Sequence, residues 1–329
     1  MSVKPLRVAV IGMGRMGRHH ANKVAELARS GGGVSMAGVT DLDGERAAAA
    51  AKTLGTRAVS DRRALFAQAD VAIVAVSAVS HFEVARDALL AGLDVLVEKP
   101  IAATLEDAEA LVALAERAGR VLQVGHQEWF NAALRVVRER IEAPRFAEIH
   151  RLGSFSDRGT DVDVVRDLMI HDLEILQQLL GEEPERIDAV GIPVLTDHVD
   201  IANARLTFGN RCVANLTASR VSMTPMRKFR FFQRDSYFSI DFLEQKAVLF
   251  RRHPPTGGEP PRIEMEELKS DPEDALRAQL EAFVRAVRRR SGIDTGTEGG
   301  VGVSGVEAAA ALRTALRVID AMPSIQDLP

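Results

Sequence analysis

The sequence predicts an α/β protein in which an N-terminal, doubly wound parallel sheet precedes an α+β domain with a large, mostly antiparallel, open-faced sheet. Up to about residue 125, short apolar strands alternate with amphipathic helices, the pattern of a parallel sheet covered by helices. Beyond Gly181 the chain is strand-rich, with turns between several segments, which is typical of an antiparallel sheet. We therefore expect two domains, 1–125 and 126–329, with the last helix packed back on the first domain.

The composition limits the partners. The 329 residues are 46% apolar and 27% charged, which is enough for a large core. A formal net charge of −4 gives no basic footprint for nucleic acid, and no apolar run reaches membrane-spanning length, so we expect neither partner. The single cysteine, Cys212, favours a reducing cytoplasm, and with the scattered histidines it leaves no metal-ligand cluster.

The stretch from Val8 to Gly17 organises the first domain. An apolar strand runs directly into Gly12, Gly14 and Gly17, and a helix-compatible segment follows. A dinucleotide site of the Rossmann type needs this order: a tight turn, close approach of the backbone to a pyrophosphate, and close packing of the next helix. Three such glycines also occur in structural turns and in other nucleotide sites, but their place between strand and helix favours the dinucleotide.

A second short strand over 34–39 leads to Asp41 and Asp43. Asp41 lies 24 positions after Gly17, close to where a dinucleotide fold presents an acid to the ribose hydroxyls. A carboxylate there repels a 2′-phosphate, so we predict NAD rather than NADP. In the alternative interpretation, Asp41 or Asp43 only caps the helix over 45–54.

Two further groups of polar residues stand where chemistry is expected. Glu98-Lys99-Pro100 ends the strand over 94–97, and open α/β sheets place their ligands at the carboxyl ends of strands. Asp167 and His171 are four positions apart on a helix over 166–180, so both project from one face. A helical histidine is often structural, but its pairing with a carboxylate after a polar loop favours a functional role.

Together, the glycine motif, Glu98-Lys99-Pro100 and the run from Asp167 to His171 resemble the Gfo/Idh/MocA family of NAD(P)-dependent sugar oxidoreductases. The resemblance implies that His171 takes the hydroxyl proton as the hydride leaves. It implies that Lys99 hydrogen-bonds the reacting hydroxyl and stabilises negative charge on its oxygen. Asp167 would orient the sugar or hold His171 in position.

The same resemblance extends the predicted sites. His126 and Asn131 are expected near the nicotinamide or the sugar, although His126 as a hydrogen-bonded turn residue stays an open alternative. Arg158 and Arg220 are candidates to pair with a diphosphate, or are surface residues. The predicted cofactor-binding residues are Gly12, Gly14, Arg15, Met16, Gly17, Asp41, Ser77, His81, Glu98, Lys99 and Gln127.

Within the family, the segments 124–131 and 164–172 are most similar to the branch that oxidises the 3-hydroxyl of UDP-N-acetylglucosamine-type sugars. That branch supplies 3-keto sugars to an aminotransferase in lipid A or surface-polysaccharide synthesis. Trp129 and Ala132 depart from it, since arginine and proline are expected at these positions. An inositol or free-sugar dehydrogenase is the first alternative. A non-catalytic NAD sensor is the second, although such a sensor has no need of a proton-transfer set. A sheet with one uncovered face also predicts a homo-oligomer, a dimer or a tetramer.

Overall fold

The computed structural model describes residues 4–156, 162–209, 211–255, 260–293 and 302–323. The chain forms two compact units. The first unit comprises Met1–Gln127 and Asp274–Ala309, and the second comprises Glu128–Glu273 and Ala310–Pro329. The sequence-based division at residue 125 lies close to the first boundary, but 274–309 group with the first unit. The packing of the last helix on the first domain stays a prediction.

The first unit contains the predicted parallel sheet, with strand order β2-β1-β3-β4-β5. Every strand pair in it is parallel, and the chain moves outward from β1 in both directions, which makes the sheet doubly wound. At the β5 edge, Ser304 forms an antiparallel bridge with Gln123. The strands are β1 (Leu6–Ile11), β2 (Val34–Thr40), β3 (Val71–Val74), β4 (Asp94–Val97) and β5 (Leu122–Val124).

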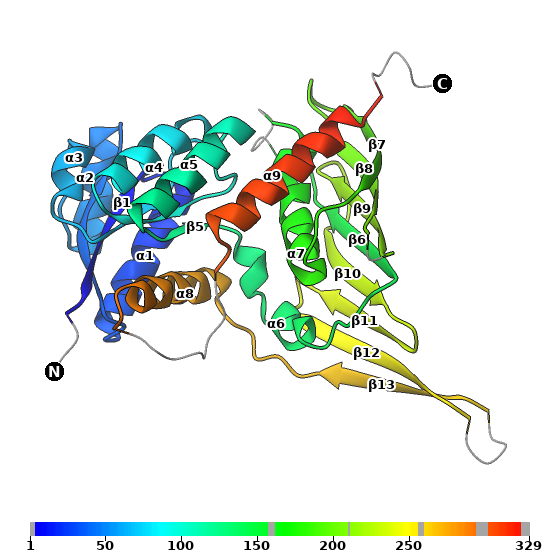
Figure 1. The fold of residues 1–329 in the computed structure, drawn as a ribbon. Coiled ribbons are helices and arrows are strands. Elements are labelled where there is room, and N and C mark those ends of the chain that lie inside the picture. The colour runs from blue at the N-terminus through cyan, green and yellow to red at the C-terminus, as the bar shows by residue number, and fades with distance from the viewer. Residues whose placement is uncertain (1–3, 157–161, 210, 256–259, 294–301, 324–329) are drawn as a thin grey trace. The chain divides into compact units, whose positions relative to one another are not determined.

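Helices cover both faces of this sheet, with α1 and α8 on one side and α4 and α5 on the other (Figure 1). Helix α8 joins the first unit because Leu280, Phe283 and Val287 enter the same core as the β1 side chains. An ion pair of 2.8 Å between Lys23 Nζ and Asp274 Oδ2 adds to this contact. The helices are α1 (Arg15–Arg29), α2 (Gly44–Leu54), α3 (Arg62–Phe66), the 3₁₀ turn η1 (Ala78–Ser80), α4 (His81–Leu90), α5 (Leu105–Ala118) and α8 (Ala275–Arg290).

The second unit is built on an eight-stranded sheet with the order β13-β12-β11-β10-β6-β9-β8-β7. All pairs are antiparallel except β6 with β9, so the predicted mostly antiparallel sheet is confirmed. Strand β6 lies between two meanders and is hydrogen-bonded on both sides. The strands are β6 (Phe146–Leu152), β7 (Arg186–Ile192), β8 (Ile201–Thr207), β9 (Val213–Ser219), β10 (Met226–Phe232), β11 (Ser236–Asp241), β12 (Lys246–His253) and β13 (Arg262–Leu268).

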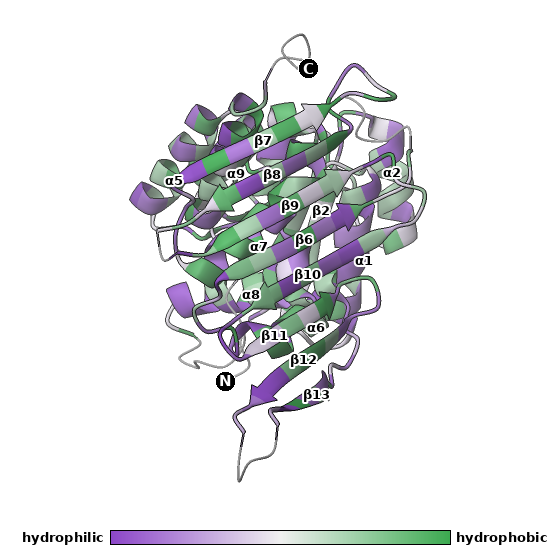
Figure 2. Cartoon of the chain, turned by 90° about the vertical axis from the view of Figure 1, so that its right-hand side faces the viewer, coloured by the Kyte–Doolittle hydropathy of each residue, from purple (hydrophilic) through white to green (hydrophobic). Residues whose placement is uncertain are grey.

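The two faces of this sheet differ. Along β6, Ala147, Ile149 and Arg151 are buried, and Arg151 contacts Asp172 on α7; Phe146 and Glu148 alternate with them and lie on the other face. That second face carries no helix from the described residues (Figure 2), which agrees with the predicted open face. No helix of the described ranges has the length and apolar character needed to cross a membrane. The remaining helical segments are η2 (Gln127–Phe130), α6 (Ala132–Arg138), the π-turn η3 (Val165–Met169), α7 (Ile170–Leu180) and α9 (Gly305–Asp320).

Candidate functional site

The glycine turn leaves an uncovered stretch of backbone at the start of α1. Gly12 has φ +90°, and a Cβ there would lie 2.5 Å from the Ala75 carbonyl oxygen. At Gly17 a Cβ would lie 1.7 Å from the Gly12 oxygen, so the helix packs directly on the turn. A Cβ at Gly14, the N-cap of α1, would meet nothing within 4 Å. The turn therefore offers helix N–H groups to an anion without steric hindrance, as a pyrophosphate requires.

Asp41 is fixed at the end of β2 beside this turn. Its Oδ2 accepts from the Met13 N–H at 2.5 Å, and its Oδ1 accepts from the Asp43 N–H at 2.8 Å. The helix cap of α2 is Asp43, whose side chain accepts from the Arg46 N–H. Of the two interpretations for these acids, the cap therefore belongs to Asp43, and Asp41 is held next to the glycine turn.

Exposed or partly exposed side chains surround the glycine turn at the carboxyl ends of β1 and β3. Arg15 is exposed, Met16 is partly exposed, and Ser77 Oγ lies 3.4 Å from Ser80 Oγ in the loop after β3. Two exposed apolar residues at this edge were not among the predicted site residues: Leu42 is fully exposed, and Val79 is 79% exposed. Each lies in the loop after a strand, Leu42 next to Asp41 and Val79 two positions after Ser77. That position was the available signal.

Glu98 is buried directly after β4 and makes a contact that the sequence did not indicate. Its Oε1 lies 2.6 Å from Nε2 of His20, a buried side chain on α1. Gly125 leaves room for the carboxylate, because a Cβ there would lie 2.9 Å from the Glu98 carboxyl carbon. His20 lies on the buried, apolar face of α1. A polar residue at such a position was the only sign in the sequence that His20 has a buried partner.

His81, predicted to bind the cofactor, faces backbone carbonyls with both ring nitrogens. Nδ1 lies 2.7 Å from the Pro100 oxygen, and Nε2 lies 3.2 Å from the Val76 oxygen. Burial lowers the pKa of His81, although these carbonyls and Glu98 oppose the shift. In this arrangement His81 braces the loop after Lys99, whose peptide bond to Pro100 is cis. Its contact with a cofactor stays a prediction.

Lys99 and His126 are brought together in the first unit, at the carboxyl ends of the adjacent strands β4 and β5. His126 is completely buried, and Gln127 follows it at the start of η2. Burial, reinforced by the charge of Lys99, lowers the pKa of His126 to about 3. The imidazole of His126 is therefore neutral at pH 7.

This shift predicts a pH dependence of folding. Between pH 6.5 and about 3, unfolded His126 binds a proton that the folded protein does not bind. Its contribution to the free energy of unfolding is therefore fully present above pH 6.5. It is lost as the pH falls, by roughly 1–1.5 kcal/mol per pH unit. We expect His126→Gln to flatten the decline of the unfolding temperature between pH 6.5 and 4.5. The exposed control His198→Asn should leave the decline unchanged; an equal decline in all three proteins would contradict the assignment.

Asp167 and His171 are both in the second unit, and both are partly buried. Asp167 belongs to η3 and His171 to the first turn of α7. The predicted continuous α-helix over 166–180 therefore begins as a π-turn. Such turns are often found at functional sites.

Two predicted substrate residues have structural partners. Asn131 caps α6: its Oδ1 accepts from the Ala133 N–H at 3.0 Å, and its Nδ2 donates to the Phe242 oxygen at 3.1 Å. Its contact with substrate stays a prediction, and so does that of Arg158, which lies outside the described residues.

Arg220 is not a surface residue, and its guanidinium has partners within the protein. It is buried, and its Nη2 donates to the Val162 oxygen at 2.6 Å while its Nε lies 3.7 Å from Asp200 Oδ1. Burial disfavours the charged form of Asp200, but the N–H groups of 194–196 and the Thr196 hydroxyl outweigh it and hold the pKa at about 2. Arg220 thereby fixes the segment that leads into η3. No group of three or more His, Cys, Asp or Glu in the described part of the chain could hold a metal ion.

Comparison with known proteins places this arrangement in a family. Residues 6–126 match the model of the oxidoreductase family with an NAD-binding Rossmann fold, and 133–235 match the GFO/IDH/MocA C-terminal domain. The chain is 39% identical over 283 residues to UDP-N-acetylglucosamine 3-dehydrogenase from Acidithiobacillus ferrooxidans, covering 86% of this chain and 88% of that enzyme. A solved structure under that name and from that organism aligns with a TM-score of 0.88 at 37% identity, covering 96% and 97% of the two chains.

Other relatives are similar over less of the chain or at lower identity. Inositol 2-dehydrogenase 3 from Saccharopolyspora erythraea is 32% identical over 187 residues, which is 54% of each protein. An oxidoreductase from Agrobacterium radiobacter, solved with NAD⁺, L-tartaric acid and magnesium, has the same fold. Its TM-score is 0.82 at 18% identity, over 97% of this chain and 96% of that one. The chain belongs to the Gfo/Idh/MocA family of oxidoreductases, and residues 6–126 are the family's NAD-binding Rossmann domain.

Proposed function

We propose that this protein oxidises the 3-hydroxyl of UDP-N-acetylglucosamine or a closely related nucleotide sugar, with NAD as the hydride acceptor. The observation that carries the proposal is the similarity to UDP-N-acetylglucosamine 3-dehydrogenase, which spans 86% of the chain, against 54% for an inositol dehydrogenase. As the resemblance of the segments 124–131 and 164–172 implies, such an enzyme supplies a 3-keto sugar to an aminotransferase in lipid A or polysaccharide synthesis. The single cysteine supports a cytoplasmic location.

The first unit has the features needed to hold NAD. The open backbone at Gly14 suits the pyrophosphate, and the Asp41 carboxylate suits the ribose hydroxyls while repelling a 2′-phosphate. The exposed side chains of Leu42 and Val79 offer apolar surface for the adenine ring. When bound, the nicotinamide supplies the hydride chemistry.

The protein's own residues handle the proton and the developing charge. We assign to His171 the removal of the hydroxyl proton, a task suited to imidazole near neutral pH. Lys99 donates a hydrogen bond to the same oxygen, which stabilises its negative charge. Asp167 orients the sugar or the imidazole. His126, neutral at pH 7, contributes hydrogen bonding rather than charge. Arg158 and Arg220 stay our candidates for the diphosphate, although Arg220 Nη2 also donates to the Val162 oxygen.

Absorbance of reduced nicotinamide tests the proposal. We expect it to rise steadily with NAD and UDP-N-acetylglucosamine, provided that an aminotransferase with its amino donor removes the ketone. The rise with NADP should be much smaller. Signal on myo-inositol or a free hexose, with none on the nucleotide sugar, would replace the proposed substrate. NAD binding without turnover on any of these substrates would support the sensor alternative.

We further propose that two copies of the chain associate through the open face of the eight-stranded sheet. Five apolar side chains face one another across neighbouring strands and form an apolar row. The ring centroids are 5.6 Å apart for Phe146 and Phe232, 5.2 Å for Phe232 and Tyr237, and 4.5 Å for Tyr237 and Phe250. The row consists of Phe146, Phe232, Tyr237, Phe250 and Met265.

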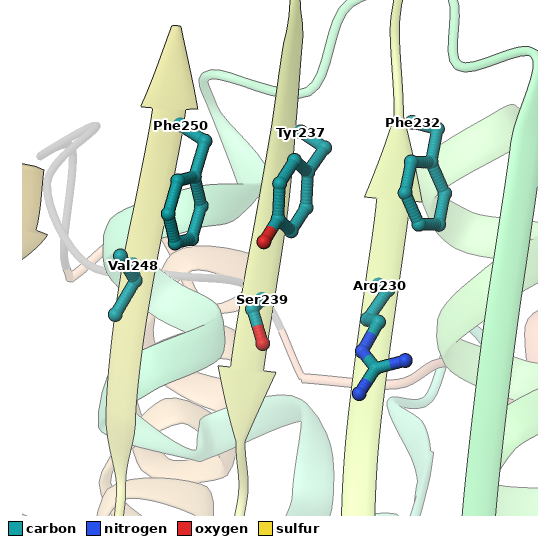
Figure 3. A pocket seen from close by; sticks show the side chains of 6 residues that line it. All are labelled: Arg230, Phe232, Tyr237, Ser239, Val248 and Phe250. Atoms are coloured by element: carbon teal, nitrogen blue, oxygen red, sulfur yellow. The ribbon is translucent and has the colours of Figure 1, made fainter. Parts of the chain in front are cut away.

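A second copy fits this surface better than a charged ligand does. The apolar row borders an open pocket of about 420 Å³, in which Phe232, Tyr237 and Phe250 lie side by side (Figure 3). The adjacent row carries both signs of charge, with Arg230 Nη1 bonded to Glu148 Oε2 at 2.8 Å. An apolar row flanked by paired charges of both signs is self-complementary across a two-fold axis.

Light scattering tests the association. We expect the parent protein to have the mass of a dimer or tetramer and Tyr237→Arg to have a smaller mass, because a cation would be buried in the apolar row. Met223→Arg, at a 98% exposed position outside this row, should keep the parent mass. A monomeric parent, or a Tyr237→Arg protein of unchanged mass, would refute the interface.

A further inference from the structure

Four charged side chains form a network in the second unit, in which Arg151 and Asp172 are buried and Arg227 is partly exposed. Arg151, on the central strand β6, is only 3% exposed, and Asp172, on α7, is 1% exposed. Arg151 Nε and Nη2 lie 2.8 and 2.6 Å from Asp172 Oδ1. Arg151 Nη1 donates to Glu128 Oε1 at 3.0 Å, and Arg227 Nη1 donates to the same oxygen at 2.8 Å. One guanidinium thus holds two carboxylates.

Stability alone does not account for this network. Burial raises the pKa of Asp172 against the pull of Arg151. Burial also opposes the charge of Arg151, but Asp172 and Glu128 outweigh it and raise the pKa of the guanidinium, so that it stays cationic. Asp172 Oδ2 is buried and has no hydrogen-bond partner among the described residues. Buried ion pairs of this kind are often replaced by apolar residues without loss of stability, so they are better explained by the geometry that they fix.

The network fixes the turn that carries the proposed proton acceptor. Asp172 directly follows His171, and both lie in the first turn of α7. Arg151 holds that turn from β6, a strand that is hydrogen-bonded on both sides and is therefore rigid. Through Glu128 the same guanidinium also holds the η2 turn, which follows directly after His126 in the chain.

We propose that Arg151 and Asp172 are positioning residues for the oxidation. They hold the first turn of α7 in the rotation that directs His171 at the substrate hydroxyl, and they do not themselves touch the substrate. This inference rests on the proposed role of His171, but it does not depend on which sugar is oxidised. Small displacements of a catalytic group lower the rate strongly while leaving the fold and the cofactor site unchanged.

Two variants separate positioning from folding. Arg151→Met/Asp172→Leu replaces the pair by apolar groups and leaves Glu128 paired with Arg227. Asp172→Glu keeps the charge but lengthens the side chain, so it displaces the helix turn. We expect at least a tenfold fall in kcat for each variant that folds, with the KM for NAD within twofold of the parent. For the double variant we also expect an unfolding temperature equal to or above the parent's. The control Arg313→Gln/Glu183→Gln breaks a partly exposed ion pair of 2.6 Å in the same unit and should keep the parental kcat.

Parental kcat in either folded variant would overturn the inference, because the network would then serve only the fold. Loss of folding in both variants would also overturn it, because the network would then be a stabilising element. If the parent oxidises myo-inositol instead of UDP-N-acetylglucosamine, the proposed substrate fails. The same kcat comparison on inositol still decides the role of Arg151 and Asp172.

Discussion

Replacement of His171 by asparagine should nearly abolish turnover and leave NAD binding intact. Asparagine keeps a polar side chain on the first turn of α7 but cannot take up a proton at neutral pH. General-base catalysis typically raises the rate by about 10²–10⁴-fold, and we expect kcat to fall by a factor in that range. Initial rates of reduced-cofactor formation measure the loss, and titration calorimetry with NAD measures the retained affinity.

The matched control is His198→Asn, which makes the same change at an exposed loop position of the same unit and should keep the parental rate. Parental activity in His171→Asn would remove His171 from the mechanism. A loss of NAD affinity as large as the loss of rate would assign His171 to the cofactor instead.

Replacement of Lys99 by methionine should also lower kcat severely. Methionine keeps much of the aliphatic length of lysine but removes the cation that we assign to the developing oxyanion. Removal of one such donor typically costs about 10²–10³-fold in rate. The substitution has a second readout, because the charge of Lys99 contributes to the low pKa of His126. A histidine NMR titration should therefore give a higher pKa for His126 in Lys99→Met than in the parent.

Lys52→Met, on the exposed side of α2, is the control for the loss of a positive charge from the same unit. It should change neither the rate nor the titration of His126. If Lys99→Met lowered the rate but left the titration of His126 unchanged, the electrostatic contact between the two residues would be refuted. Parental kcat in Lys99→Met would remove Lys99 from the reaction.

The parts of the fold that the sequence predicted are those in which local pattern and tertiary role agree. The turn from β1 to α1 is an example, because the crowded positions of Gly12 and Gly17 admit only glycine, and an open Gly14 lies between them. The strands of the parallel sheet are buried apolar runs and are easy to recognise. Strand β13 was not predicted, because it is an edge strand with charged residues on both faces and only Leu268 buried. The short helices α3 and α6 were also missed, since they have too few turns for a periodic signal.

The sequence offers candidate site residues where they follow strand ends or helix spacing, as for Lys99, Asp167 and His171, whose roles stay predictions. The contacts around these residues could not be predicted, because they join residues far apart in the chain. Arg220 could be read as a surface cation until its burial against Asp200 was known. Glu98 meets His20 across 78 positions, and Arg151 meets Asp172 across 21. No local pattern encodes such pairs, because tertiary packing alone decides which polar side chains are buried together.

The most direct test of the central claim is to follow the hydrogen that the enzyme removes. UDP-N-acetylglucosamine carrying deuterium only at C3 would be incubated with the protein and NAD, and the reduced cofactor would be analysed by mass spectrometry. Oxidation at the 3-hydroxyl predicts reduced cofactor that carries one deuterium, and unlabelled reduced cofactor from substrate deuterated only at C4. Unlabelled reduced cofactor from the C3-labelled sugar, or no reduced cofactor at all, would contradict the proposed reaction.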